Sequence, residues 1–309
     1  MSPLSNEAEP AIHARGLTKH FGDVHAVDNL DLTVSRGEVF GFLGPNGAGK
    51  STAMRLMLDL IRPTSGSVSI MGFDSRKDAV EIRRHIGYLP GDLALYPALT
   101  GKQLIAYFAN LRGGVDWNYV GELSERLSAD LDVKISDYST GNRQKVGLIQ
   151  AFMNKPTLVM LDEPSTGLDP LVQQEFQAML REITDEGRTV FLSSHTLSEV
   201  DRVADRVGII RKGNLVVVET MEQLKLKAIR HVTFHFSAPI PKDTFNGVTG
   251  VEEATYDDEK VVLAFKGSMS DLVKTASRFE VINMNSAEGD LEEIFLTYYR
   301  DANAPSVSA

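Results

Sequence analysis

The chain has 309 residues, of which 42% are hydrophobic and 24% charged, as in an ordinary globular protein of more than one domain. Asp and Glu outnumber Lys and Arg by 42 to 32, giving a net charge of −10, so no nucleic-acid partner is expected, because phosphate backbones normally bind basic surfaces. The absence of cysteine excludes disulfide scaffolds, thiolate metal sites and cysteine nucleophiles.

The two ends of the chain are small and polar, and residues 1–10 and 301–309 are predicted to be flexible. The N-terminus has neither the basic start nor the apolar stretch of a signal peptide. No run of 18 apolar residues occurs, so we expect any membrane role to depend on a separate membrane-spanning partner.

Residues 11–221 alternate short apolar runs with helical patterns. The runs VFGFLG, TLVMLDEP, TVFLSS and RVGII are β-branched, apolar and bounded by turn residues, which is typical of buried parallel strands. Strands that alternate with helices predict an α/β fold. Residues 92–153 lack such runs and are predicted to be a helical insertion.

A phosphate-binding loop is predicted between the first of these strands and a helix. Residues 44–51 fit the pattern G-x-x-x-x-G-K-[ST] at every defined position. Lys50 is expected to reach the β- and γ-phosphates of a nucleotide, and Ser51 to bind Mg²⁺. The predicted nucleotide-binding residues of this segment are Gly44, Pro45, Asn46, Gly47, Ala48, Gly49, Lys50, Ser51 and Thr52.

The apolar run at residues 158–161 ends in two adjacent carboxylates, Asp162 and Glu163. Asp162 stands where a P-loop enzyme places an acid for Mg²⁺, directly or through water. Glu163 is expected to act as the general base that polarises the attacking water. An acidic pair at a strand end is otherwise usually a helix cap, and the upstream phosphate loop is what favours catalysis here.

Three short motifs complete a pattern around the acidic pair. Residues 138–142 (YSTGN) precede the pair, residues 165–169 (STGLD) follow it, and Ser193-Ser194-His195 ends a later strand. In this order, over about residues 12–219, the motifs resemble those of the nucleotide-binding subunits of ABC transporters. The resemblance implies a P-loop NTPase core with an antiparallel flank and a helical insertion. It also implies ATP and Mg²⁺ as cofactors, with ATP held between two copies of the chain or between paired ATPase subunits.

The resemblance gives roles to five further residues. It implies that Phe21 stacks on adenine, although a core phenylalanine remains the alternative. Ser139 and Gly141 would belong to the signature loop that caps ATP on the partner subunit, the alternative being a simple helix cap. Asp169 would lie in the loop through which the subunits sense each other, and His195 would hold the general base and water in line.

Two departures from the family pattern stand out. In the signature loop, Tyr138, Thr140 and Asn142 differ from the usual residues, and the β-branched Thr140 restricts close approach. Gly91 stands where the family has a glutamine that touches the metal and links to the membrane partner. Either Asp92 replaces part of that contact, or the link runs through backbone and neighbours such as Tyr96.

Residues 222–300 are predicted to form a small α+β domain. HVTFHF and KVVLAF alternate as strands do, and SDLVKTASRF and DLEEIFLTYY carry amphipathic helical patterns. The domain resembles the extension on ATPases of the ABC-2 exporter type, often linked to drug efflux. His231 and His235 share a strand face, but we interpret them as exposed residues because no third metal ligand accompanies them.

The sequence therefore predicts an ATP-binding and hydrolysing subunit that powers a membrane transporter of the exporter type through ATP-driven closure of a dimer. It would work at the cytoplasmic face of the cell membrane, bound to a separate membrane-spanning permease. The alternative is a soluble ABC-type ATPase with a mechanical or regulatory role. Such proteins usually carry two cassettes or a long coiled-coil insertion, and this chain has one cassette and a short insertion.

Overall fold

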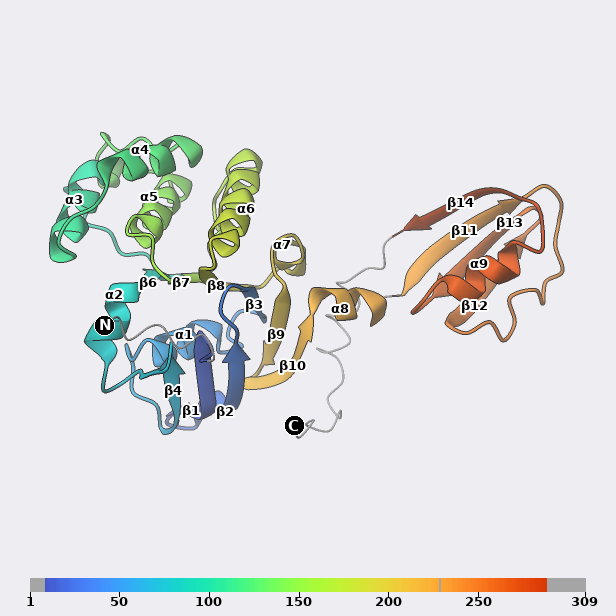
Figure 1. Cartoon of the computed structure of the whole chain (residues 1–309), viewed down its shortest axis with the longest axis horizontal. Helices are drawn as coiled ribbons and strands as arrows, with labels where there is room; N and C mark the ends of the chain where they lie inside the picture. The colour runs from blue at the N-terminus through green and yellow to red at the C-terminus, as the bar shows by residue number, and fades with distance from the viewer. Residues whose placement is uncertain (1–8, 228, 288–309) are drawn as a thin grey trace. The chain divides into compact units, whose positions relative to one another are not determined.

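The computed structural model describes residues 9–227 and 229–287 (Figure 1). The chain divides into two compact units, Met1–Val218 and Glu219–Ala309. Within the described residues, no helix combines the length and the apolar character needed to cross a bilayer.

A six-stranded, largely parallel sheet forms the centre of the first unit. Its order is β10-β9-β3-β8-β7-β6, and the five strands from β9 to β6 run parallel to one another. Strands β3, β7 and β8 are buried along their whole length, because helices and a second sheet pack against them. The strands are β3 (Val39–Leu43), β6 (Ile86–Leu89), β7 (Leu158–Asp162), β8 (Thr189–Ser194), β9 (Arg206–Arg211) and β10 (Asn214–Thr220).

A second, antiparallel sheet packs on the same core. Its order is β2-β1-β4-β5, with bounds β1 (Ile12–Phe21), β2 (Val24–Val34), β4 (Ser65–Ile70) and β5 (Phe73–Asp74). Helix α1 (Lys50–Met57) buries Met54 and Met57 in a hydrophobic cluster shared with this sheet and with Phe40 and Phe191 of the parallel sheet. The helix that follows the phosphate loop is therefore fixed by both sheets. The predicted α/β core with an antiparallel flank is confirmed.

Helices dominate the stretch between β6 and β7, as predicted for the insertion at 92–153. They are α3 (Gly101–Leu111), α4 (Trp117–Arg126), a short 3-10 turn η1 (Ile135–Asp137) and α5 (Thr140–Phe152). Thr100 begins α3 with a reciprocal capping box to Gln103, and Asp116 caps α4. The other helices of the unit are α2 (Ala79–His85), α6 (Pro170–Asp185) and α7 (Leu197–Asp201).

Over residues 219–227 and 229–287, the second unit contains an antiparallel sheet of order β12-β13-β11-β14 and two short helices. Val232, Phe234 and Phe236 alternate along β11 and are all buried, as their spacing predicts. The elements are α8 (Met221–Lys227), β11 (Arg230–Phe236), β12 (Val251–Asp257), β13 (Lys260–Phe265), α9 (Ser270–Ala276) and β14 (Val281–Ala287). The second predicted helix of this domain, DLEEIFLTYY, lies outside the described residues, as do most of the two predicted flexible ends.

Candidate functional site

Three neighbouring parallel strands bring the predicted catalytic segments to one edge of the sheet. In the pairing register, Leu43 of β3 lies opposite Ser194 of β8, and Asp162 of β7 lies opposite Ser193. The phosphate loop, the acidic pair and His195 each begin where one of these strands ends. Segments more than 100 residues apart in sequence therefore meet at a single site.

The phosphate loop leads directly into α1. Gly49 precedes the helix with a φ of 110°, and a side-chain Cβ there would lie 2.3 Å from the carbonyl oxygen of Ala26, so only glycine fits. The first turn of α1 carries no acidic side chain. Its backbone N–H groups are therefore suited to an anion such as a phosphate.

Lys50 is 5% exposed and is held at the base of the loop. Its Nζ donates to the carbonyl oxygens of Gly44 at 2.6 Å and Pro45 at 3.2 Å. The same ammonium lies 3.2 Å from Glu163 Oε1, so the two side chains form an ion pair. Of the remaining loop residues, Pro45, Asn46 and Gly47 are exposed, Ser51 and Thr52 are half-buried on α1, and Ala48 is buried.

The carboxylate of Glu163 lies between Lys50 and His195 and contacts both. Its Oε2 lies 2.7 Å from Nδ1 of His195, while its Oε1 faces Lys50. The residue has a φ of 51°, a left-handed conformation that a non-glycine side chain adopts at a cost. Two contacts hold it there: its N–H donates to Ser193 Oγ at 3.1 Å, and its carbonyl accepts from Gln144 Nε2 at 3.1 Å.

Asp162 is fully buried beside it. Its Oδ1 accepts a 2.5 Å hydrogen bond from Ser193 Oγ, whereas its Oδ2 is buried without a hydrogen-bond partner. An unpartnered buried carboxylate oxygen is costly and is the donor that a hard cation prefers. Burial raises the pKa of the neighbouring Tyr88, and the negative charge of Asp162 raises it further.

Gly91 lies directly over this carboxylate. A Cβ at position 91 would come within 2.9 Å of Asp162 Oδ2, so a side chain at this position would be directed at the acid. Glycine leaves that approach open, and the adjacent Asp92 is exposed. The position that the family fills with glutamine therefore lies beside Asp162, the predicted Mg²⁺ ligand, but Gly91 has no side chain to reach it.

The signature segment begins α5. Ser139 is the N-cap residue of this helix, and its Oγ accepts from the Asn142 N–H at 3.2 Å. Gly141 lies against Gly167 of the 165–169 loop, which brings the two motifs together. Asp169 caps α6; the backbone N–H of Val172 and then the charge of Lys145, 3.6 Å away, lower its pKa.

Phe21 ends β1, and its side chain is 51% exposed. The ammonium of Lys19 lies 4.8 Å from the centre of its ring. The core-phenylalanine alternative is therefore wrong for this residue. An exposed ring at the end of a strand leaves a face available for stacking.

Ser193 and Gln144 hold the acidic pair, yet neither was among the predicted site residues. The hydroxyl of Ser193 contacts both Asp162 and Glu163, and the amide of Gln144 donates to the carbonyls of Glu163 and Pro164. Ser193 could have been predicted, because it is a polar residue at the carboxyl end of a buried strand, where such sites form. For Gln144 the sequence offers none, because its contact depends on how α5 packs.

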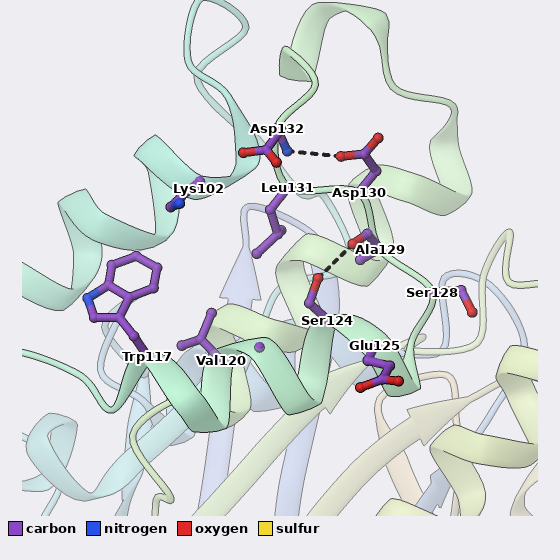
Figure 2. Close-up of a pocket in the computed structure, with 11 residues that line it drawn as sticks. Lys102, Trp117, Val120, Ser124, Glu125, Ser128, Ala129, Asp130, Leu131 and Asp132 are labelled. Carbon is purple, nitrogen blue, oxygen red and sulfur yellow. Dashed lines mark hydrogen bonds between the residues drawn. The ribbon is translucent and has the colours of Figure 1, made fainter.

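A separate hollow of about 740 Å³ lies in the helical insertion (Figure 2). The residues that line it are Lys102, the 44% exposed Trp117, Val120, Gly121, Ser124, Glu125, Ser128, Ala129, Asp130, Leu131 and Asp132. Ser124 Oγ donates to the Ala129 carbonyl, and the Asp132 N–H donates to Asp130 Oδ1, so its wall is internally hydrogen-bonded. None of the predicted nucleotide-binding residues lines this pocket.

Comparisons with known proteins identify relatives across most of the chain. The family model described as ABC transporter matches residues 27–166. The chain is 32% identical over 294 residues to the bacitracin transport ATP-binding protein BcrA of Enterococcus faecalis, covering 93% of this chain and 96% of that protein. It is 37% identical to the daunorubicin resistance ATP-binding protein DrrA3 of Streptomyces coeruleorubidus, covering 71% of each.

Solved structures agree with the fold. An ATP-binding subunit of an ABC transporter is 28% identical with a TM-score of 0.64, covering 70% of this chain and 92% of that one. The dimeric bacterial ABC transporter cassette MJ0796 is 24% identical with a TM-score of 0.63, covering 68% and 98%. At that identity the second likeness shows the fold alone.

Proposed function

Because this chain belongs to the family of ATP-binding subunits of ABC transporters and is an ATPase, we propose that it powers export of an antibiotic or drug-like compound through a separate permease. Support for the substrate class comes from two relatives whose names refer to bacitracin transport and daunorubicin resistance. The chain would work at the cytoplasmic face of the cell membrane, held there by the permease.

The observation that carries the chemistry is the Glu163 carboxylate between Lys50 and His195. In this account the γ-phosphate of ATP takes the place of the carboxylate beside Lys50. Glu163 is then released to accept a proton from the attacking water. His195 holds Glu163 and that water in line with the phosphate. The left-handed backbone at Glu163 favours this role, because strain of this kind persists where function requires a fixed direction.

Mg²⁺ fits the acid beside it. The buried, unpartnered Oδ2 of Asp162 is a ready ligand, and the Ser51 hydroxyl on the first turn of α1 is the second residue we assign to the ion. Bound Mg²⁺ would neutralise charge that develops on the transferred phosphoryl group. Ser193 orients Asp162 by its hydrogen bond to the other carboxylate oxygen.

The second half of each site would come from another copy of the chain or from a paired ATPase subunit. Ser139 is exposed at the start of α5, whose first turn carries no acidic side chain. Its hydroxyl bonds the Asn142 N–H of the same helix, and Gly141 lies against Gly167. An exposed helix start of this kind is suited to cap a phosphate from outside. ATP between two copies would supply the missing contacts.

The pocket in the helical insertion is our proposed contact with the permease. It presents an exposed indole, three carboxylates (Glu125, Asp130 and Asp132) and one ammonium, that of Lys102. This excess of negative charge beside an aromatic ring favours a partner segment with a basic side chain. Trp117→Ala should reduce permease-stimulated ATP turnover while leaving the basal turnover of the isolated chain unchanged; equal stimulation in both proteins would contradict this contact.

The direct test of the ATPase proposal is nucleotide binding and hydrolysis by the purified chain and its Lys50→Ala variant. Removing the ammonium should weaken ATP binding by about tenfold or more and abolish measurable turnover, because a charge-assisted contact to phosphate is lost. Lys155→Ala, on the surface away from the loop, serves as the matched control. Equal ATP affinity in the Lys50 variant and the parent would contradict the assigned site.

A further inference from the structure

The hairpin formed by β1 and β2 gathers two histidines and an aspartate. In the strand register, His20 lies opposite His25, and their rings stack with centroids 3.9 Å apart and planes inclined by 24°. Asp28 follows three residues after His25 on β2. One possible ligand atom from each of the three lies within 4.8 Å of the others, the single such group of His, Cys, Asp and Glu found among residues 9–227 and 229–287.

Two hydrogen bonds that the side chains of this group could make are absent. Nε2 of His20 is buried and makes no hydrogen bond. The nearest approach of His25 to Asp28 is 3.8 Å between Nδ1 and Oδ2, beyond hydrogen-bond distance. A buried ring nitrogen without a hydrogen-bond partner costs free energy, unless an ion or another group binds to it.

We propose that His20, His25 and Asp28 bind a divalent transition-metal ion of the zinc type. Two imidazole nitrogens and one carboxylate oxygen form a ligand set that favours Zn²⁺ and its neighbours over Mg²⁺ or Ca²⁺, which prefer oxygen alone. Ligand bonds of about 2.1 Å require the three atoms to lie within roughly 4 Å of one another. Exposed His25 and half-exposed Asp28 can close that difference by side-chain rotation. This rotation must also turn the His25 ring out of its stack on His20, because a ring nitrogen binds a metal through a lone pair that lies in the ring plane. Water completes the fourth position.

The site is separate from Asp162, the predicted Mg²⁺ ligand, but lies next to predicted nucleotide-binding residues. Phe21 comes directly after His20, and the carbonyl of Ala26, next to His25, packs against Gly49 of the phosphate loop. The backbone N–H of Asp28 donates to Gly213, whose own N–H donates to Ala48. A bound ion would therefore cross-link β1, which carries Phe21, to β2.

Titration of the untagged, nucleotide-free chain with ZnCl₂ in a calorimeter tests the proposal. The parent should bind one more equivalent than His25→Ala, or bind that equivalent at least about tenfold more tightly. His25 is exposed, so its removal leaves the fold intact, and Asp28→Asn keeps the backbone N–H that bonds Gly213. His235→Ala, an exposed histidine on β11, is the control and should bind as the parent does.

CoCl₂ provides a second readout, since tetrahedral cobalt absorbs strongly in the visible range and that band should be lost in both variants. Circular dichroism checks that each variant is folded. The proposal is overturned if the parent binds no ion more tightly than about 0.1 mM. Binding that is unchanged in both His25→Ala and Asp28→Asn overturns it as well.

Discussion

Strand β7 of the first unit and strand β11 of the second show how differently the two units use their sheets. β7 is buried along its whole length and ends in Asp162, a buried acid with an unpartnered oxygen. β11 alternates buried Val232, Phe234 and Phe236 with more exposed residues and ends in apolar packing. One strand delivers a costly polar group to a site, whereas the other only fills a core.

The comparison indicates that the catalytic groups lie where strands end in buried polar residues. At the edge formed by β3, β7 and β8, a left-handed glutamate, an unpartnered aspartate oxygen and a buried lysine lie together. Such groups persist only when the surrounding fold compensates for them, and they mark functional sites. In the second unit, Phe234 stacks with Phe236 and Phe245 at 5.8 and 5.9 Å, an arrangement that favours stability.

The largest expected effect is on the stability of the second unit. Phe234→Ala removes a 1% exposed ring and should lower that unit's free energy of unfolding by about 3–5 kcal/mol. Hydrogen exchange of β11 and β13 measures this, while fluorescence of the single tryptophan, Trp117, reports on the first unit. His235→Ala, on the same strand but exposed, should change stability by less than about 0.5 kcal/mol. Equal losses in both units would mean that they do not unfold separately.

Glu163→Gln should reduce ATP hydrolysis and leave the stability of the fold unchanged. We expect ATP turnover to fall by about 100-fold or more, about 2.7 kcal/mol on the barrier, because the general base is lost. ATP binding should be retained, as measured by equilibrium titration. Glu122→Gln, exposed on α4, is the control. Turnover near that of the parent would remove Glu163 from this role.

Ser193→Ala should have a smaller catalytic effect. The hydroxyl contacts Asp162 at 2.5 Å and Glu163 at 3.1 Å, so its loss loosens both acids without removing either, and we expect turnover to fall by about tenfold. Ser194→Ala is matched to it, because that hydroxyl bonds Thr196 and Glu199 instead. A loss of turnover in Ser194→Ala as large as in Ser193→Ala would show that the acidic pair is not what Ser193 supports.

The smallest expected effect is that of removing the second unit on nucleotide affinity. A chain that ends at Met221 keeps every predicted phosphate-contacting residue, so its ATP affinity should stay within about twofold of the parent. We propose that the second unit stabilises the dimer or regulates it, so the shortened chain should dimerise more weakly. Full ATPase activity, dimerisation and transport in the shortened chain would show that the unit is dispensable.

Local patterns were enough to predict most of the fold. The apolar runs at residues 39–43, 158–162 and 189–194 predicted buried strands, and the alternation in 232–236 predicted a one-sided strand. The phosphate loop followed from the spacing of its residues within one segment. These features depend on neighbours in sequence, which a pattern can record.

The parts that could not be predicted depend on register and packing between distant segments. His20 and His25 face each other because of where β1 turns into β2, and the pairing shifts register between Lys19 and His20. Gly91 lies over Asp162 because β6 and β7 are paired with Leu89 opposite Leu161. Gln144 reaches the acidic pair through the placement of α5, which no local pattern encodes.

We propose that each nucleotide site is completed by another copy of the chain or by a paired ATPase subunit, and completion by another copy can be tested with this chain alone. Light scattering of the Glu163→Gln variant with saturating ATP and Mg²⁺ tests it most directly, because hydrolysis cannot then separate the copies. We expect a mass of twice 33.9 kDa with ATP and only weak self-association without it. A monomer at high concentration, with ATP shown to be bound, would contradict it.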